Sequence, residues 1–103
     1  MIKGTTPTLH FNLPIDTKII KAAEIVLKYV DNAKTVTIER TLEDCIVGDN
    51  SIATVLTQEE TLALPAPTNA KVQIRVLTVD NLVFASPVFK VAVKELLKES
   101  VIE

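Results

Sequence analysis

The chain has 103 residues, of which 48% are hydrophobic and 23% charged, and its net charge at pH 7 is -2. This length and balance are typical of one globular domain that buries about two-thirds of its unfolded surface, and they exclude the disordered class. The single cysteine, Cys45, excludes an internal disulfide. The basic residues are scattered, which excludes nucleic acid as a partner, and no stretch reaches the roughly 18 uncharged residues of a membrane span.

Alternation of apolar and polar residues predicts most of the elements, beginning with residues 8–13. Successive side chains leave a strand on opposite faces, so Leu9, Phe11 and Leu13 are expected to face the core. Pro14 lacks the amide proton that a ladder needs and is expected to end the strand.

The next segment fits two patterns. Asp16 or Thr17 can cap a short helical turn, and a helical stripe of apolar residues continues from there into residues 23–30. The same residues 23–30 also alternate as a strand does. We favour the strand, because residues 31–33 have the composition of a turn and residues 35–39 alternate with β-branched side chains, which together predict a hairpin.

The second half of the chain continues the same pattern. Thr57 and Glu60 have the spacing of a capping box, which predicts a brief helical turn, and residues 65–69 form a proline-rich loop. Further strands are expected at residues 51–56, 71–78, 82–85 and 88–93.

Seven short strands with helical turns only in the connections predict an all-β fold, an antiparallel immunoglobulin-like β-sandwich forming a single domain over residues 1–103. Residues 94–103 have helical spacing over only two turns. We expect them to be a tail whose order depends on a partner to pack against.

The sequence offers no convergent set of catalytic or metal-binding residues. His10 stands alone on the polar side of its strand, and the acidic neighbours of Cys45 raise a thiol's pKa rather than activate it. Asp44, Asp49 and Asn50 supply oxygens for a calcium ion but lack the regular spacing of a calcium loop. We therefore expect no enzyme activity, no catalytic residue, no cofactor and no bound metal.

The chain carries more hydrophobic residues than one small core needs. Part of this surplus, including Val79, Val83 and Val88, belongs either to the core in another register or to an interface. An exposed apolar patch on a small domain usually marks assembly with another chain. The residues predicted to form the interface are Val26, Val30, Leu96, Leu97 and Ile102.

Four groups of residues, in this order along the chain, form a pattern that resembles a known family. They are residues 4–8 with Leu13, Pro14 and Asp16; residues 43–45; residues 56–62, Leu-Thr-Gln-Glu-Glu-Thr-Leu; and residues 73–75 with Ala85 and Ser86. The pattern is similar to small uncharacterised proteins of phages and prophage-like elements of gut-associated Firmicutes. The resemblance implies a phage context but carries no functional residue across, and the loop at residues 65–69 is longer and richer in proline than in the family.

These observations predict a non-enzymatic phage structural or accessory protein that acts by protein–protein assembly in a head, tail or fibre. Its expected partners are other copies of itself or other phage structural proteins, and its expected location is the host cytoplasm, with incorporation into a virion. The alternative is a virion-displayed module that binds a host-cell surface or carbohydrate. In that case Tyr29 is the aromatic residue expected to pack against a sugar.

Overall fold

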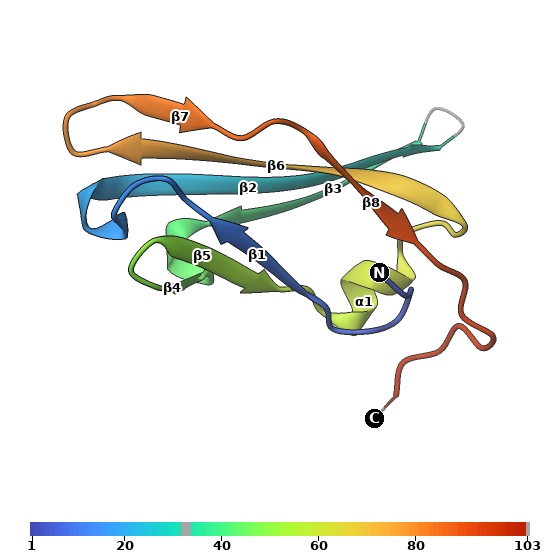
Figure 1. Ribbon diagram of the computed structural model, residues 1–103. Coiled ribbons are helices and arrows are strands. Elements are labelled where there is room, and N and C mark those ends of the chain that lie inside the picture. The colour runs from blue at the N-terminus through green and yellow to red at the C-terminus, as the bar shows by residue number, and fades with distance from the viewer. Residues whose placement is uncertain (32–33, 103) are drawn as a thin grey trace.

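The computed structural model describes residues 1–31 and 34–102 and shows two antiparallel sheets packed face to face (Figure 1). The smaller sheet has the order β1-β5-β4, and the larger has the order β3-β2-β6-β7, with β8 also paired to β6. The strands are β1 (Thr8–Asn12), β2 (Ile20–Asp31), β3 (Lys34–Thr41), β4 (Ile46–Val47), β5 (Ser51–Val55), β6 (Thr68–Thr78), β7 (Val83–Ala85) and β8 (Phe89–Val93). The predicted β-sandwich is therefore confirmed.

The strand order is that of an immunoglobulin-like sandwich. In that fold one sheet has the order A-B-E-D and the other G-F-C, extended in some members by C′. Here β1, β5 and β4 stand in the places of B, E and D, and β3, β2 and β6 in those of C′, C and F. Strands β7 and β8 share the place of G. The place of strand A, beside β1, is not filled by any strand in the described part of the chain.

The core lies between β2 and β6, the two long strands at the centre of the larger sheet, and the smaller sheet that covers them. Alternate residues of both strands point inward, as their sequences require. The inner face carries Ala23, Ile25, Leu27 and Tyr29 from β2 and Ala70, Val72, Ile74 and Val76 from β6, all of them buried. Thus the prediction of a strand rather than a helix at residues 23–30 is confirmed.

Short helices occupy the connections, as expected. They are η1 (Thr17–Ile19), η2 (Leu42–Asp44) and α1 (Gln58–Leu62). The Asp16 side chain caps η1 by accepting from the Lys18 N–H at 2.9 Å. The predicted capping box is present: Thr57 Oγ1 accepts from the Glu60 N–H, and the Glu60 carboxylate accepts from the Thr57 N–H. None of the helices in residues 1–31 and 34–102 has the length and hydropathy needed to cross a membrane.

Three details differ from the sequence-based expectation. The described residues contain eight strands rather than seven, because the two-residue strand β4 is too short to give an alternation signal. Strand β6 begins at Thr68, inside the segment expected to be a loop. The tail after residue 94 forms no helix in its described part, since two turns lack the length for a stable helix without packing.

Candidate functional site

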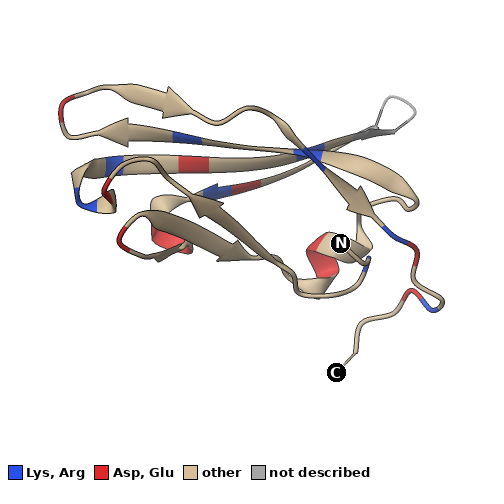
Figure 2. Ribbon diagram, in the orientation of Figure 1, with Lys and Arg blue, Asp and Glu red and all other residues tan. Residues whose placement is uncertain are grey.

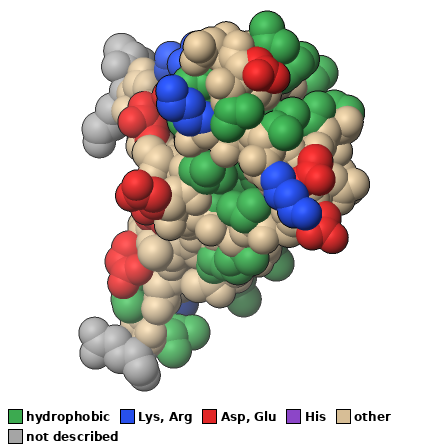
Figure 3. Space-filling view, turned by 90° about the vertical axis from the view of Figure 1, so that its left-hand side faces the viewer, with side chains coloured by type: hydrophobic (Ala, Val, Ile, Leu, Met, Phe, Trp, Pro, Cys, Tyr) green, Lys and Arg blue, Asp and Glu red, His purple; other side chains and the backbone are tan. Residues whose placement is uncertain are grey.

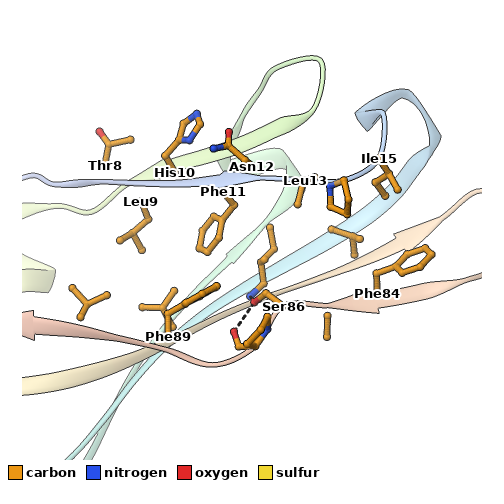
Figure 4. A pocket seen from close by; sticks show the side chains of 17 residues that line it. Thr8, Leu9, His10, Phe11, Asn12, Leu13, Ile15, Phe84, Ser86 and Phe89 are labelled. Carbon is orange, nitrogen blue, oxygen red and sulfur yellow. Dashed lines mark hydrogen bonds between the residues drawn. The ribbon is translucent and has the colours of Figure 1, made fainter.

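An apolar groove of about 630 Å³ opens between the two sheets, where β1 of the smaller sheet faces β7 and β8 of the larger one (Figure 4). Residues of β6 form its floor, and Pro14 and Ile15 close one end. The inward side chains that dominate the lining are Leu9, Phe11, Leu13, Phe84, Phe89 and Val91. A volume of this size is within the range of binding pockets, roughly 300–1,000 Å³.

Strand β1 supplies one wall through the alternation seen in its sequence. Figure 4 shows Leu9, Phe11 and Leu13 pointing into the groove, while His10 and Asn12 point away from it. The three inward residues are only half-buried, although they pack against the core. Their inward orientation confirms the prediction, but the space they face is not filled from the opposite side.

The free edge of β1 also presents backbone groups to this opening. The flanking Leu13 N–H donates to Asn50 O at 2.7 Å, and Pro7 O accepts from the Leu56 N–H at 3.0 Å. Because ladder bonds alternate along an antiparallel pair, the odd-numbered residues between them bond to β5. The peptide groups of Thr8, His10 and Asn12 therefore point away from β5, along the open edge.

The opposite wall is one strand interrupted by a bulge. The pairing of β6 with β7 and its pairing with β8 differ in register by one residue, so one extra residue is accommodated near Ser86. Ser86 holds the ladder together there: its N–H donates to Ile74 O at 2.9 Å, and its Oγ accepts from the Ile74 N–H at 3.1 Å. The Gln73 side chain donates to Ser86 O at 2.9 Å.

Several large hydrophobic side chains in and beside the groove are exposed to solvent. Phe84 and Phe89 are 47% and 48% exposed, although both point toward the interior of the sandwich. Val83 and Val88, on the same strand pair, are exposed as well. Figure 3, a view onto the end that carries the β6–β7 turn, shows hydrophobic side chains gathered through the centre of that face with acidic groups along its side.

None of the described residues that line the groove is a lysine, arginine, aspartate or glutamate. Figure 2 places lysine, arginine, aspartate and glutamate on the larger sheet, the short helices, the turns and the tail, while β1 and β7 have none. A charged ligand group buried there would lack a charged partner, so the lining suits uncharged, apolar side chains.

The carboxyl and thiol groups with shifted pKa values lie outside the groove. The Arg40 guanidinium donates a hydrogen bond to Glu60 Oε1, and this contact lowers the pKa of the Glu60 carboxyl. Hydrogen bonds from Thr41 lower the pKa of the Asp44 carboxyl in the same way. Burial, with a smaller contribution from Asp44, raises the pKa of the Cys45 thiol, as its acidic neighbours led us to expect. These groups stabilise η2 and α1.

The residues predicted to form the interface are not brought together. Val26 is half-buried on the outer face of the larger sheet, opposite Glu39 and Gln73. Leu97 and Ile102 are fully and largely exposed in the tail, which leaves the sandwich at the end marked by the C-terminus in Figure 1. The side chain of Val30 lies outside the described residues.

Leu96, the fifth predicted residue, is engaged within the chain. It is half-buried, and a Cβ on Gly4 would lie 2.6 Å from its Cδ2. The tail is further attached by an ion pair between Lys3 and Glu99 and by two hydrogen bonds, both 2.9 Å long, between the Gln58 side chain and the Ile102 backbone. Tail order in this structure thus comes from the chain's own first residues and α1.

The remaining candidate residues offer little chemistry. His10 is exposed and points away from the groove, and Tyr29 is 8% exposed within the core. Over residues 1–31 and 34–102, no three His, Cys, Asp or Glu side chains gather where they could hold a metal ion. Tyr29 therefore cannot supply the exposed aromatic face that the carbohydrate-binding alternative requires.

Sequence reasoning missed the groove as a site. Phe84 and Phe89 each fall within a predicted strand, but which strand faces them depends on strand order, which alternation does not encode. The available signal was the surplus of apolar residues in and around residues 79–89. Comparison of the chain with protein-family models, curated proteins and solved structures gives no match.

Proposed function

We propose that the protein is a non-enzymatic module that acts by protein–protein assembly, as a structural or accessory component of a phage particle. The observation that supports assembly is the open groove between the two sheets, along one edge of the sandwich. A groove of about 630 Å³, whose described lining residues are uncharged, lies between two open sheet edges; the exposed Phe84 and Phe89 line it, and the exposed Val88 lies next to Phe89. Small domains rarely expose contiguous apolar surface unless it binds something.

The phage context is supported by the sequence resemblance described above. Small β-sandwiches serve many functions, so the fold by itself does not favour one of them. In this proposal the partners are other copies of the chain or other structural proteins of the particle, and the exposed tail residues Leu97 and Ile102 add apolar contact area.

The mass of the purified protein, measured by light scattering after size exclusion from micromolar to millimolar concentration, tests self-assembly. A discrete oligomer is the expected result, and Leu97→Asp should weaken it while leaving the fold intact, because Leu97 makes no buried contact. Lys98→Asp, at the neighbouring exposed position, is the matched control for the added charge. A monomer at every concentration would contradict self-assembly, and an oligomer unchanged in Leu97→Asp would remove the tail from the interface.

A further inference from the structure

The groove lies where the immunoglobulin-like order has a strand that the described part of this chain does not supply. One wall is the free edge of β1 and the other is the free edge of β7 and β8, and these two walls run in opposite directions (Figure 1). In the immunoglobulin-like order this is the place of strand A, which pairs beside B. An open edge with unpaired peptide groups is a template for an added strand.

The first residues of the chain already show how such a strand would pair. Ile2 forms a parallel bridge with Lys94, just beyond the end of β8. The Met1 amino group donates to Ala92 O at 2.8 Å, and Met1 O accepts from the Lys94 N–H at 2.7 Å. The next step of the same parallel ladder, toward Phe89, would use Lys90 O and the Ala92 N–H, which point away from β6 along the open edge of β8.

The lining specifies the side chains that this strand must carry. Met1 packs partly buried against the core, so in a strand continuing its direction every second residue would point into the groove. Those positions meet Leu9, Phe11, Phe89 and Val91, and no charged lining residue could pair with a buried charge. The occupant must therefore be apolar at alternate positions.

This chain has no free segment of that kind among its described residues. Its alternating runs are already paired in the two sheets. The exposed tail does not meet this requirement. With Leu97 and Val101 pointing inward, the strand would bury Glu99, and in the other register it would bury Lys98.

We propose that the groove accepts an extended segment of a different protein chain, apolar at alternate positions, as an added β-strand parallel to β8 and antiparallel to β1. This inference rests on the proposed function and names the class of partner. Backbone hydrogen bonds to the two edges would give affinity, and the inward side chains would give specificity.

Two extensions of the full chain test whether the groove accepts a strand. In the first, the inward-phase variant, Val-Thr-Val-Thr-Val-Thr precedes Met1, so that valines occupy the second, fourth and sixth positions before it and point inward. In the second, the outward-phase variant, Thr-Val-Thr-Val-Thr-Val has the same composition but the opposite phase, which turns the valines outward. We expect the first to raise the melting temperature by about 5 °C or more relative to the second. Equal melting temperatures would overturn the proposal.

A labelled peptide of the first sequence, flanked by lysines for solubility, tests binding between molecules. Fluorescence anisotropy should show binding to the native protein and to the outward-phase variant, and loss of binding to the inward-phase variant, whose groove is occupied. Phe89→Asp should weaken binding at least tenfold, whereas Val83→Asp, on the same strand pair but outside the lining, should not. Binding that survives in the inward-phase variant would place the peptide elsewhere and overturn the proposal.

The other occupants give distinct results. A native oligomer that the inward-phase extension converts to a monomer would assign the groove to a second copy and contradict a different partner chain. A melting temperature raised by dodecanoate, but by neither extension, would assign it to a small apolar ligand. If the native protein is an oligomer whose mass neither extension changes, and the two variants have equal melting temperatures, this inference is overturned while the proposed function stands. If the native protein is a monomer that binds the peptide, this inference stands and self-assembly is contradicted.

Discussion

Ser86 is the residue on which the bulged strand of the groove depends. Its hydroxyl replaces a backbone carbonyl as acceptor for the Ile74 N–H, at the point where the register of β7 changes to that of β8. Ser86→Ala should lower the free energy of unfolding by about 1–2 kcal/mol, because the Ile74 N–H loses its partner in a part-buried position.

Chemical denaturation of the two proteins measures this difference. Ser86→Thr retains a hydroxyl at the same position and is the matched control, which should recover most of the loss. A Ser86→Ala protein as stable as the native one would mean that water, or a shifted strand, satisfies the Ile74 N–H equally well.

Glu60 gives the protein a specific dependence on pH. Its pKa is lowered in the folded state by Arg40, so the stabilisation is present above its unfolded pKa of about 4.5 and is lost as the pH falls through the folded value. Glu60→Gln should cost from a few tenths to about 1 kcal/mol at pH 7, since the pair is partly open to solvent, and progressively less below about pH 4.

Unfolding free energies measured from pH 7 to pH 3 check this prediction. Glu24→Gln is the control, because Glu24 also contacts an arginine, Arg75, but both side chains are more than half exposed. It should change stability little at any pH. A Glu60→Gln effect that is constant across this range would show that the charge of Glu60 does not contribute.

The turn between the first residues and β1 is the element that holds the tail. Gly4 has φ = 76°, a conformation that glycine adopts without strain, and it lies against Leu96 and Leu62. Gly4→Ala should cost about 1–2 kcal/mol and displace Leu96, because its Cβ would lie 2.6 Å from the Leu96 side chain.

Amide hydrogen exchange of residues 94–102 reads out the displacement, and denaturation reads out the stability. Gly48→Ala is the matched control: its backbone is not left-handed, and the near contact is the Ser51 hydroxyl, which can rotate away. Equal effects of the two substitutions would show that neither the backbone conformation nor the contact with Leu96 distinguishes Gly4.

Secondary-structure elements are predicted well from the sequence where the interactions that form them join near neighbours in the chain. The alternation of residues 71–78 and the capping box of Thr57 and Glu60 each depend on neighbours in the chain, and both are confirmed. The groove depends on which strand packs opposite which, a property of the whole chain. Leu9 and Phe89 are therefore recognisable as inward residues from sequence, but not as members of one lining.

The tail also shows that sequence patterns do not predict contacts between residues far apart in the chain. Its helical spacing extends over too few residues to form a helix alone, and contacts with Gly4, Lys3 and Gln58 determine its path. Those contacts join residues that are 44 or more positions apart in the sequence, so no local pattern predicts them.

For the whole molecule, the nature of the open edge predicts how assembly responds to salt. The groove lining is uncharged and the net charge is only -2, so neither attraction nor repulsion between charges should dominate association through this face. Burial of apolar surface is instead strengthened by sulfate, which is excluded from protein surfaces. Fluorescence anisotropy should therefore show that binding of the valine–threonine peptide persists in sodium chloride and becomes tighter in ammonium sulfate. Loss of binding in sodium chloride would point to a charged interface. Phe89→Asp should weaken binding at every salt concentration, because it adds a carboxylate to the groove.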